Sequence, residues 1–167
     1  MQLNKICLLL SLLFISAVCV GAQIEQASAK KIKIYALRLR PGQDLRIELE
    51  KFTKENKISA GFIMTAVGSL KDTKIRLADQ SETTSFAGKF EIVSLVGTLA
   101  PDGVHLHISL SDGTGKTIGG HLTEGCLIYT TAEIVIGVTG EIVFTCETDQ
   151  ETTYKELKIR KRKRSKN

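Results

Sequence analysis

Residues 104–111 read VHLHISLS, in which apolar and polar side chains alternate without interruption. Alternation with a period of two is typical of a β-strand that buries one face. The preceding Pro101-Asp102-Gly103 favours a tight turn, which predicts that Lys89–Leu99 and Val104–Ser111 pair as an antiparallel hairpin. This hairpin excludes a fold made only of helices.

The rest of the chain continues the strand pattern around one helical segment. Asp44 is a suitable N-cap, and Leu45, Leu49 and Phe52 recur at helical spacing, which predicts a helix over Leu45–Asn56. The fold class we expect is therefore α+β, a mainly antiparallel β-sheet packed by one long helix. The further strands expected are Lys31–Arg40, Ile58–Val67, Lys71–Ala78, Cys126–Val138, Glu141–Glu147 and, at an edge, Tyr154–Ile159.

The length and the N-terminus predict a single exported domain. At 167 residues and 43% hydrophobic content, the chain can bury one core and is too short for two domains. Lys5, the apolar run Ile6–Val20 and the small residues after it form the layout of a secretory signal peptide, shorter than the roughly 20 residues of a membrane span. An uncleaved N-terminal anchor is the alternative. We expect a secreted or periplasmic protein without a membrane span after signal removal, with a signal peptide at 1–22, a linker at 23–30, the domain at 31–159 and a basic disordered tail at 160–167.

The net charge of +5 is concentrated at the C-terminus. Seven lysines and arginines lie between residues 158 and 166. Without these seven positive charges the net charge of +5 becomes −2, so the domain itself is not basic. Nucleic acid is therefore expected to bind only weakly, through the tail, without sequence preference and with steep dependence on salt. The tail residues concerned are Arg160, Lys161, Arg162, Lys163 and Arg164.

The cysteines leave two alternatives open. Cys7 and Cys19 lie in the expected signal peptide, whereas Cys126 and Cys146 lie in strand-like segments. Export would place these two in an oxidising compartment, where a cross-strand disulfide forms if the Cβ geometry permits. Two buried free thiols are the other outcome.

All three histidines of the chain lie between residues 105 and 121. Strand alternation places His105 and His107 on the same polar face, about 6.6 Å apart along the strand. We expect Gly119-Gly120 to form the turn that brings His121 toward this pair. Three neutral imidazoles bind Zn²⁺ at about 2.0–2.1 Å and leave a fourth position open for water or a ligand. From the residues alone, three ordinary surface or interface side chains remain the alternative.

An open zinc site can also catalyse hydrolysis, because zinc lowers the pKa of bound water to about 7. Such a reaction needs a base and a substrate pocket nearby. The candidate catalytic residues are Glu133 and Asp112, as base or as groups that orient the imidazoles. Asp112 has the alternative role of starting an Asp-Gly turn, and Glu133 that of pairing with a basic group between subunits. Whether the protein is an enzyme stays open.

Four segments carry a family resemblance. The two segments nearer the C-terminus, residues 88–99 and the histidine motifs that follow, are the more specific because of their order and spacing. Over about Ile34–Ile159 the chain resembles the plant and prokaryote conserved (PPC) domain family, and it is similar to the stand-alone prokaryotic members because no Arg-Gly-Arg-Pro AT-hook occurs in it. The segments are Arg40-Pro41-Gly42 with the helix that follows, AGFIMTAVGSL (60–70), GKFEIVSLVGTL (88–99), and HLHISLSD followed by GGHL, GC and TTAEI.

The resemblance implies an α+β fold that assembles as a homotrimer. It also implies that the histidines of the HLH and GGHL motifs, here His105, His107 and His121, surround a metal, usually zinc. The family's DNA reading belongs to the missing hook, and Lys89 replaces an arginine associated with partner binding in plant members. We therefore expect an exported homotrimer that binds zinc and a small ligand, with DNA binding, the family's usual label, and zinc-dependent hydrolysis as alternatives.

Overall fold

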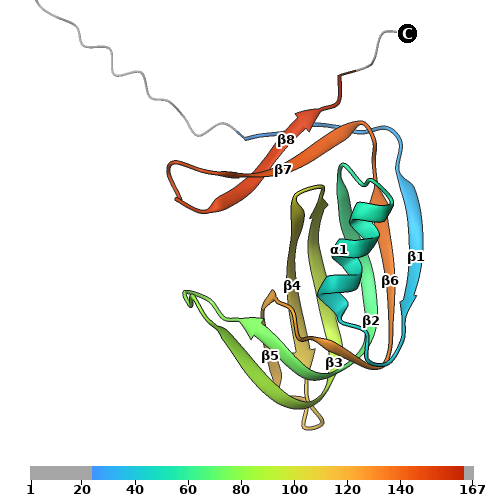
Figure 1. Ribbon diagram of the computed structural model, residues 1–167, viewed down its shortest axis with the longest axis vertical. Coiled ribbons are helices and arrows are strands. Elements are labelled where there is room, and N and C mark those ends of the chain that lie inside the picture. Colours follow the sequence, from blue (N-terminus) through green and yellow to red (C-terminus); the bar gives the residue numbers. More distant parts are fainter. Residues whose placement is uncertain (1–23, 164–167) are drawn as a thin grey trace, which may run out of the picture.

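The computed structural model describes residues 24–163, which form one helix and eight strands (Figure 1). Every strand pairing is antiparallel, so the α+β prediction is confirmed. The predicted signal peptide at 1–22 lies outside the described residues, as do the last four residues of the predicted tail. The elements are β1 (Lys33–Leu39), α1 (Leu45–Glu55), β2 (Gly61–Arg76), β3 (Thr83–Ala100), β4 (Gly103–Ser111), β5 (Thr117–Leu122), β6 (Leu127–Val138), β7 (Ile142–Thr148) and β8 (Lys155–Lys161).

Six strands form the main sheet, in the order β1-β6-β2-β3-β4-β5. β5 also pairs with the end of β2, so β2, β3, β4 and β5 close on one another. The expected strands Ile58–Val67 and Lys71–Ala78 are one continuous 16-residue strand, β2. Gly68, with φ of +142°, and an irregularity between Lys71 and Thr73 let this strand bend without ending.

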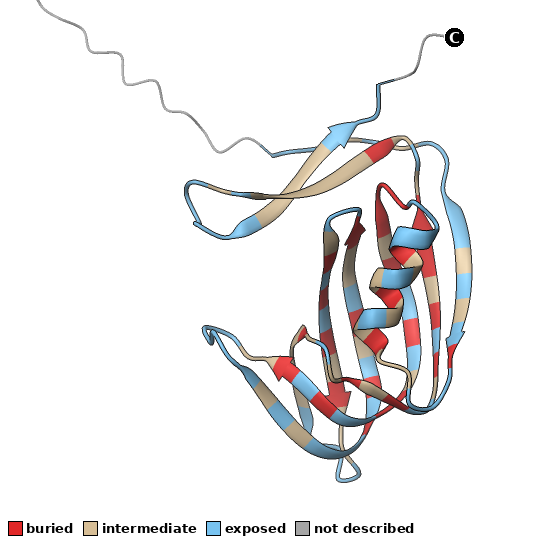
Figure 2. Ribbon diagram, viewed as in Figure 1, coloured by how far each residue is buried: buried red, intermediate tan, exposed pale blue. Residues whose placement is uncertain are grey.

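Helix α1 covers one face of the sheet (Figure 1) and contacts β3, β4 and β6. The Asp44 carboxylate accepts hydrogen bonds from the backbone nitrogens of Arg46 and Ile47, which confirms the predicted N-cap. The helix has 11 residues and is short rather than long, because Lys57 adopts a φ of +51° and turns the chain away. Leu45 and Leu49 are completely buried, and the red bands of buried residues in Figure 2 mark the core between helix and sheet.

The glycine-rich segment 117–122 is a strand, so the predicted turn at Gly119-Gly120 is wrong. A Cβ atom at Gly119 would lie 2.9 Å from the carbonyl oxygen of Ile108, and one at Gly120 would lie 2.5 Å from that of Arg76. Because glycine has no Cβ, β5 can pass close to both β4 and β2. The close backbone approach, rather than a bend, explains the two glycines.

The ribbon of β7 and β8 forms a second, two-stranded sheet beside one end of the main sheet (Figure 1). Hydrogen bonds attach β7 to the main sheet. The backbone nitrogens of Phe144 and Cys146 donate to the Ser59 carbonyl and the Asp102 carboxylate, and the Ser59 hydroxyl donates to the Ile142 carbonyl. β8 continues through Lys161, so the first two residues of the predicted tail belong to a strand.

Cys126 and Cys146 are free thiols in the structure, so the disulfide alternative is not formed. Cys126 is buried beside Thr73, and burial raises the pKa of its thiol, whereas Cys146 on β7 is only partly buried. Between residues 24 and 163, no helix is long and apolar enough to span a membrane.

Candidate metal centre

The three histidines converge on one face of the sheet. In β4 the alternating residues Val104, Leu106, Ile108 and Leu110 are buried, while His105 and His107 are exposed, as the sequence predicts. His121 lies in β5 directly opposite His107 in the β4–β5 ladder. Antiparallel pairing therefore brings the third imidazole to the first two from a separate segment.

The rings are close enough to share one ion. The ring centroid of His107 lies 5.2 Å from that of His105 and 4.3 Å from that of His121, and the centroids of His105 and His121 are 5.3 Å apart. One nitrogen from each ring can be chosen so that all three lie within 4.8 Å of one another. Tetrahedral zinc with bonds of about 2.0–2.1 Å needs nitrogens about 3.3 Å apart, a distance that small side-chain rotations reach. The donor set and its spacing therefore fit a metal.

The surroundings favour neutral imidazoles, the form that binds metals. Desolvation, followed by the positive charge of Arg76 and repulsion from the other two histidines, lowers the pKa of His121 to about 4. Desolvation and then the nearby His107 also lower the pKa of His105. At neutral pH these two rings therefore carry no proton that a metal must displace.

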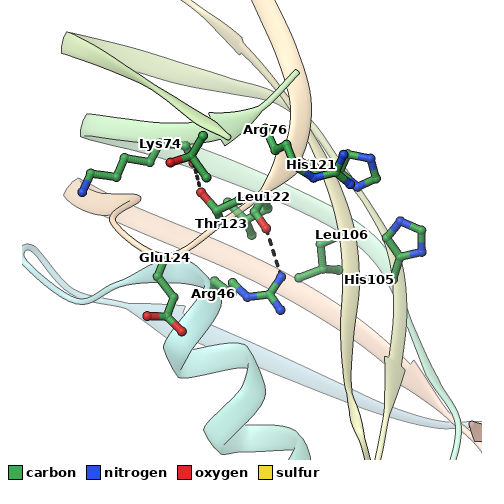
Figure 3. A pocket seen from close by; sticks show the side chains of 10 residues that line it. Arg46, Lys74, Arg76, His105, Leu106, His121, Leu122, Thr123 and Glu124 are labelled. Carbon is green, nitrogen blue, oxygen red and sulfur yellow. Dashed lines mark hydrogen bonds between the residues drawn. The ribbon is translucent and has the colours of Figure 1, made fainter. Parts of the chain in front are cut away.

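An open pocket of about 470 Å³ lies beside the histidines. It lies at the end of β5, where His121 pairs with β4 on one side and with β2 on the other. Figure 3 shows the side chains that line it. The three cationic residues of this pocket were not identified from the sequence; they are Arg46, Lys74 and Arg76. The available signal was that Lys74 and Arg76 lie two positions apart and therefore share one face of a predicted strand. We call it the histidine pocket, and its lining residues are Arg46, Lys74, Arg76, Thr83, His105, Leu106, His121, Leu122, Thr123 and Glu124.

The two carboxylates considered for catalysis lie elsewhere. The Asp112 carboxylate accepts hydrogen bonds from the Thr114 hydroxyl and from the backbone nitrogens of Thr114 and Lys116, and these bonds lower its pKa. It therefore organises the β4–β5 turn, about 16 Å along the strand from His107. Glu133 lies on β6 opposite Arg38 and Val67.

Neither Asp112 nor Glu133 lines the histidine pocket. Glu124 is the carboxylate that does so, and no sequence pattern singled it out.

A family model described as the Plants and Prokaryotes Conserved (PCC) domain matches residues 26–140. The chain belongs to this family. The match confirms the predicted resemblance, includes all three histidines and ends before the β7–β8 ribbon.

A curated relative, the bifunctional protein GlmU of Synechococcus sp. strain JA-3-3Ab, is 51% identical over 130 residues, which is 78% of this chain. This chain spans about a fifth of that relative, 21% of its length. The similarity therefore concerns one segment of a much longer protein.

Solved structures share the fold. A hypothetical protein from Salmonella cholerae-suis is 41% identical with a TM-score of 0.79, over 82% of this chain and 99% of that one. A metal-containing protein from Archaeoglobus fulgidus is 25% identical with a TM-score of 0.67, over 81% and 98%. Proteins described as candidate DNA-binding proteins also match, at 19% and 20% identity, a level that shows the fold alone.

Proposed function

We propose that this chain is an exported, homotrimeric PCC-domain protein that binds zinc through His105, His107 and His121 and accepts a ligand beside the metal. The observation that carries the proposal is the convergence of three imidazoles, with donor atoms within 4.8 Å, from two paired strands. The metal-containing Archaeoglobus relative supports it. Export rests on the sequence of residues 1–22 alone.

The chain's own residues would hold the metal and leave one side open. His105 and His107 are exposed, and His121 is partly buried, so a metal held by the three rings would remain accessible to a ligand. The histidine pocket adjoins the cluster, and Arg76 and Leu122 lie there beside His121. When bound, zinc supplies a Lewis-acidic centre that polarises an oxygen of the ligand.

An apolar surface supports the homotrimer. Four large apolar residues on β2 and β3 are between 50% and 58% exposed, although such side chains are usually buried. One of them, Val96, lies opposite His107 in the β3–β4 ladder, so the surface adjoins the metal centre. Contact with another copy would remove this surface from water. We call it the valine surface, and its residues are Met64, Val67, Val93 and Val96.

Zinc-dependent hydrolysis is the second candidate function. The observation that favours it is Glu124, a carboxylate that lines the same pocket as His105 and His121. Nucleic-acid binding is the weakest candidate of the three. Arg160, in the basic C-terminal segment, already pairs with Glu147 at 2.7 Å, which reduces the charge that a phosphate backbone would meet.

Elemental analysis of the purified mature chain tests the metal site. We expect about one zinc per subunit in the wild type and almost none in His107→Ala, because the ring of His107 contacts both other rings. Ser109→Ala is the matched control, since Ser109 is the next polar residue on the same face of β4 and lies outside the cluster. A wild type that takes up no metal, or a His107→Ala protein that keeps it, would contradict the proposal.

A further inference from the structure

The histidine pocket contains a second recognition element beside the metal centre. We propose that its ligand is a small oxyanion, a molecule with a carboxylate or phosphate group, held by the guanidinium group of Arg76. This inference deepens the proposed function and rests on it, because the ligand would share the pocket with the metal.

Arg76 is the arginine nearest to the histidines. It ends β2 and lies directly opposite His121 in the β2–β5 pairing (Figure 3). In the described part of the chain its guanidinium makes one hydrogen bond, from Nη1 to the carbonyl oxygen of Gln80 at 3.2 Å, and no ion pair with a carboxylate. The other donors of its planar fork are therefore free for an anion.

Arg46 reaches the same pocket from the first turn of α1. Its Nη1 donates to the carbonyl oxygen of Leu122 at 3.0 Å (Figure 3). Its Nη2 pairs with Glu50 at 2.8 Å. The side chain is only 25% exposed, so these two partners fix the guanidinium in the wall of the pocket. Arg46 therefore shapes the wall of the pocket, and Arg76 is the lining arginine with donors left for an oxyanion.

The charge balance of the pocket favours an anion. Arg46, Arg76 and Lys74 line it with a single carboxylate, Glu124. Arg46 is also paired with Glu50, so in the described part of the chain Arg76 and Lys74 supply the positive charge that has no ion-pair partner. The stem of Lys74 passes over Gly125, where an added Cβ would lie 2.8 Å from it, and its ammonium lies at the outer rim (Figure 3). Bound zinc would add further positive charge beside the arginines.

The size of the pocket limits the ligand. A volume of about 470 Å³ suits a small molecule. An oxyanion fits this pocket, because its oxygens can accept two parallel hydrogen bonds from the planar guanidinium of Arg76.

Titration calorimetry of the zinc-loaded mature protein tests the inference, with inorganic phosphate and succinate as probes. We expect at least one probe to bind, and Arg76→Gln to weaken its binding by about tenfold or more through loss of charge-assisted hydrogen bonds. Arg76→Lys, which keeps the charge and loses the fork, should fall between wild type and Arg76→Gln. Arg40→Gln is the matched control, because Arg40 is exposed and does not line the pocket.

The zinc content of each sample separates the two proposals. If the wild type holds zinc but binds neither probe, or if Arg40→Gln weakens binding as much as Arg76→Gln, the oxyanion inference is overturned and the metal site stands. If phosphate binds with the same dependence on Arg76 but no zinc is held, the metal proposal fails and the arginine pocket stands. Tighter binding of succinate or of phosphate identifies the carboxylate or the phosphate as the group recognised.

Discussion

Two pockets of equal volume, about 470 Å³ each, lie on different parts of the sheet and differ in chemistry. The histidine pocket, at β4 and β5, contains three cationic residues and two imidazoles. The other, which we call the outer pocket, is mainly aliphatic, and Arg38 and Glu133 are its charged residues. Volume therefore does not distinguish the two, whereas side-chain chemistry does. The outer pocket is lined by Ala36, Leu37, Arg38, Thr65, Val67, Glu133, Ile134 and Val135.

The same strand alternation exposes the histidines and the valine surface. Strand alternation exposes His105 and His107 on β4, and it exposes Val67 on β2 and Val96 on β3. Imidazoles exposed next to a cationic pocket suit a metal and its ligand, whereas exposed valines suit contact with another protein surface. This difference agrees with the proposal that one region binds a ligand and the other contacts further copies of the chain.

The largest expected effect is a change of oligomeric state on substitution of Val67, which belongs to both the outer pocket and the valine surface. We expect Val67→Lys to convert a trimer into monomers, because a lysine buried between subunits would lose its hydration. Light scattering of the mature protein measures the change as a threefold fall in mass. In the monomer the new lysine would lie opposite Glu133 and remain hydrated, so folding should persist.

Ile47→Lys is the control for this substitution. Ile47 is 45% exposed but lies on α1, away from the valine surface. If Ile47→Lys changes the mass as much as Val67→Lys, or if the wild type itself is monomeric, the assignment of self-association to the valine surface is wrong.

The same substitution, glycine to alanine, can be made beside the histidines or beside the valine surface. Gly97 in β3 and Gly68 in β2 have φ of +141° and +142°, and an added Cβ would overlap the carbonyl oxygen of His105 or of Thr131, respectively. We expect each substitution by alanine to lower the free energy of unfolding by about 3 kcal/mol, measured by urea denaturation. Gly97→Ala should also weaken zinc binding, because it displaces the backbone of His105, whereas Gly68→Ala should not.

Gly113→Ala provides the baseline, since an added Cβ there meets nothing within 4 Å and its φ lies outside the positive range. Equal loss of zinc affinity in Gly68→Ala and Gly97→Ala would show that the metal centre depends on global stability rather than on the local β3–β4 ladder.

A smaller change in the free energy of unfolding is expected when the pH is lowered. It should come from the histidine region, since the outer pocket contains no histidine. The pKa of His121 is about 4 in the fold and 6.5 in its ordinary state. Between these values the unfolded chain binds a proton that the folded protein does not. The free energy of unfolding of the metal-free protein should therefore fall as the pH is lowered from 6.5 toward 4 and level off below that.

Urea denaturation across this pH range measures the dependence. His121→Gln should show a shallower decline, because glutamine does not titrate. The ring is only partly buried, so we expect less than the roughly 1.4 kcal/mol per pKa unit that a fully buried group would give. An equally steep decline in the variant would assign the effect to other groups.

Much of the fold could be predicted from local patterns. The Asp44 cap, the helix start at Leu45 and the β3–β4 hairpin depend on neighbours in the sequence, and the structure contains all three. The 117–122 strand could not be predicted in this way, because glycine has low strand propensity and Gly119 and Gly120 are explained only by the backbones of β4 and β2 beside them.

The sequence alone determined that His105 and His107 share an exposed face, since a strand with buried aliphatic residues has no other arrangement for the side chains between them. His121 was predicted to join them, through a turn and by family resemblance, but only the tertiary structure decided that it does so from a paired strand and that Arg46 and Arg76 line the same pocket. These residues come from β5, α1 and β2, and the pairing of β5 with both β4 and β2 is a long-range contact that no local pattern encodes.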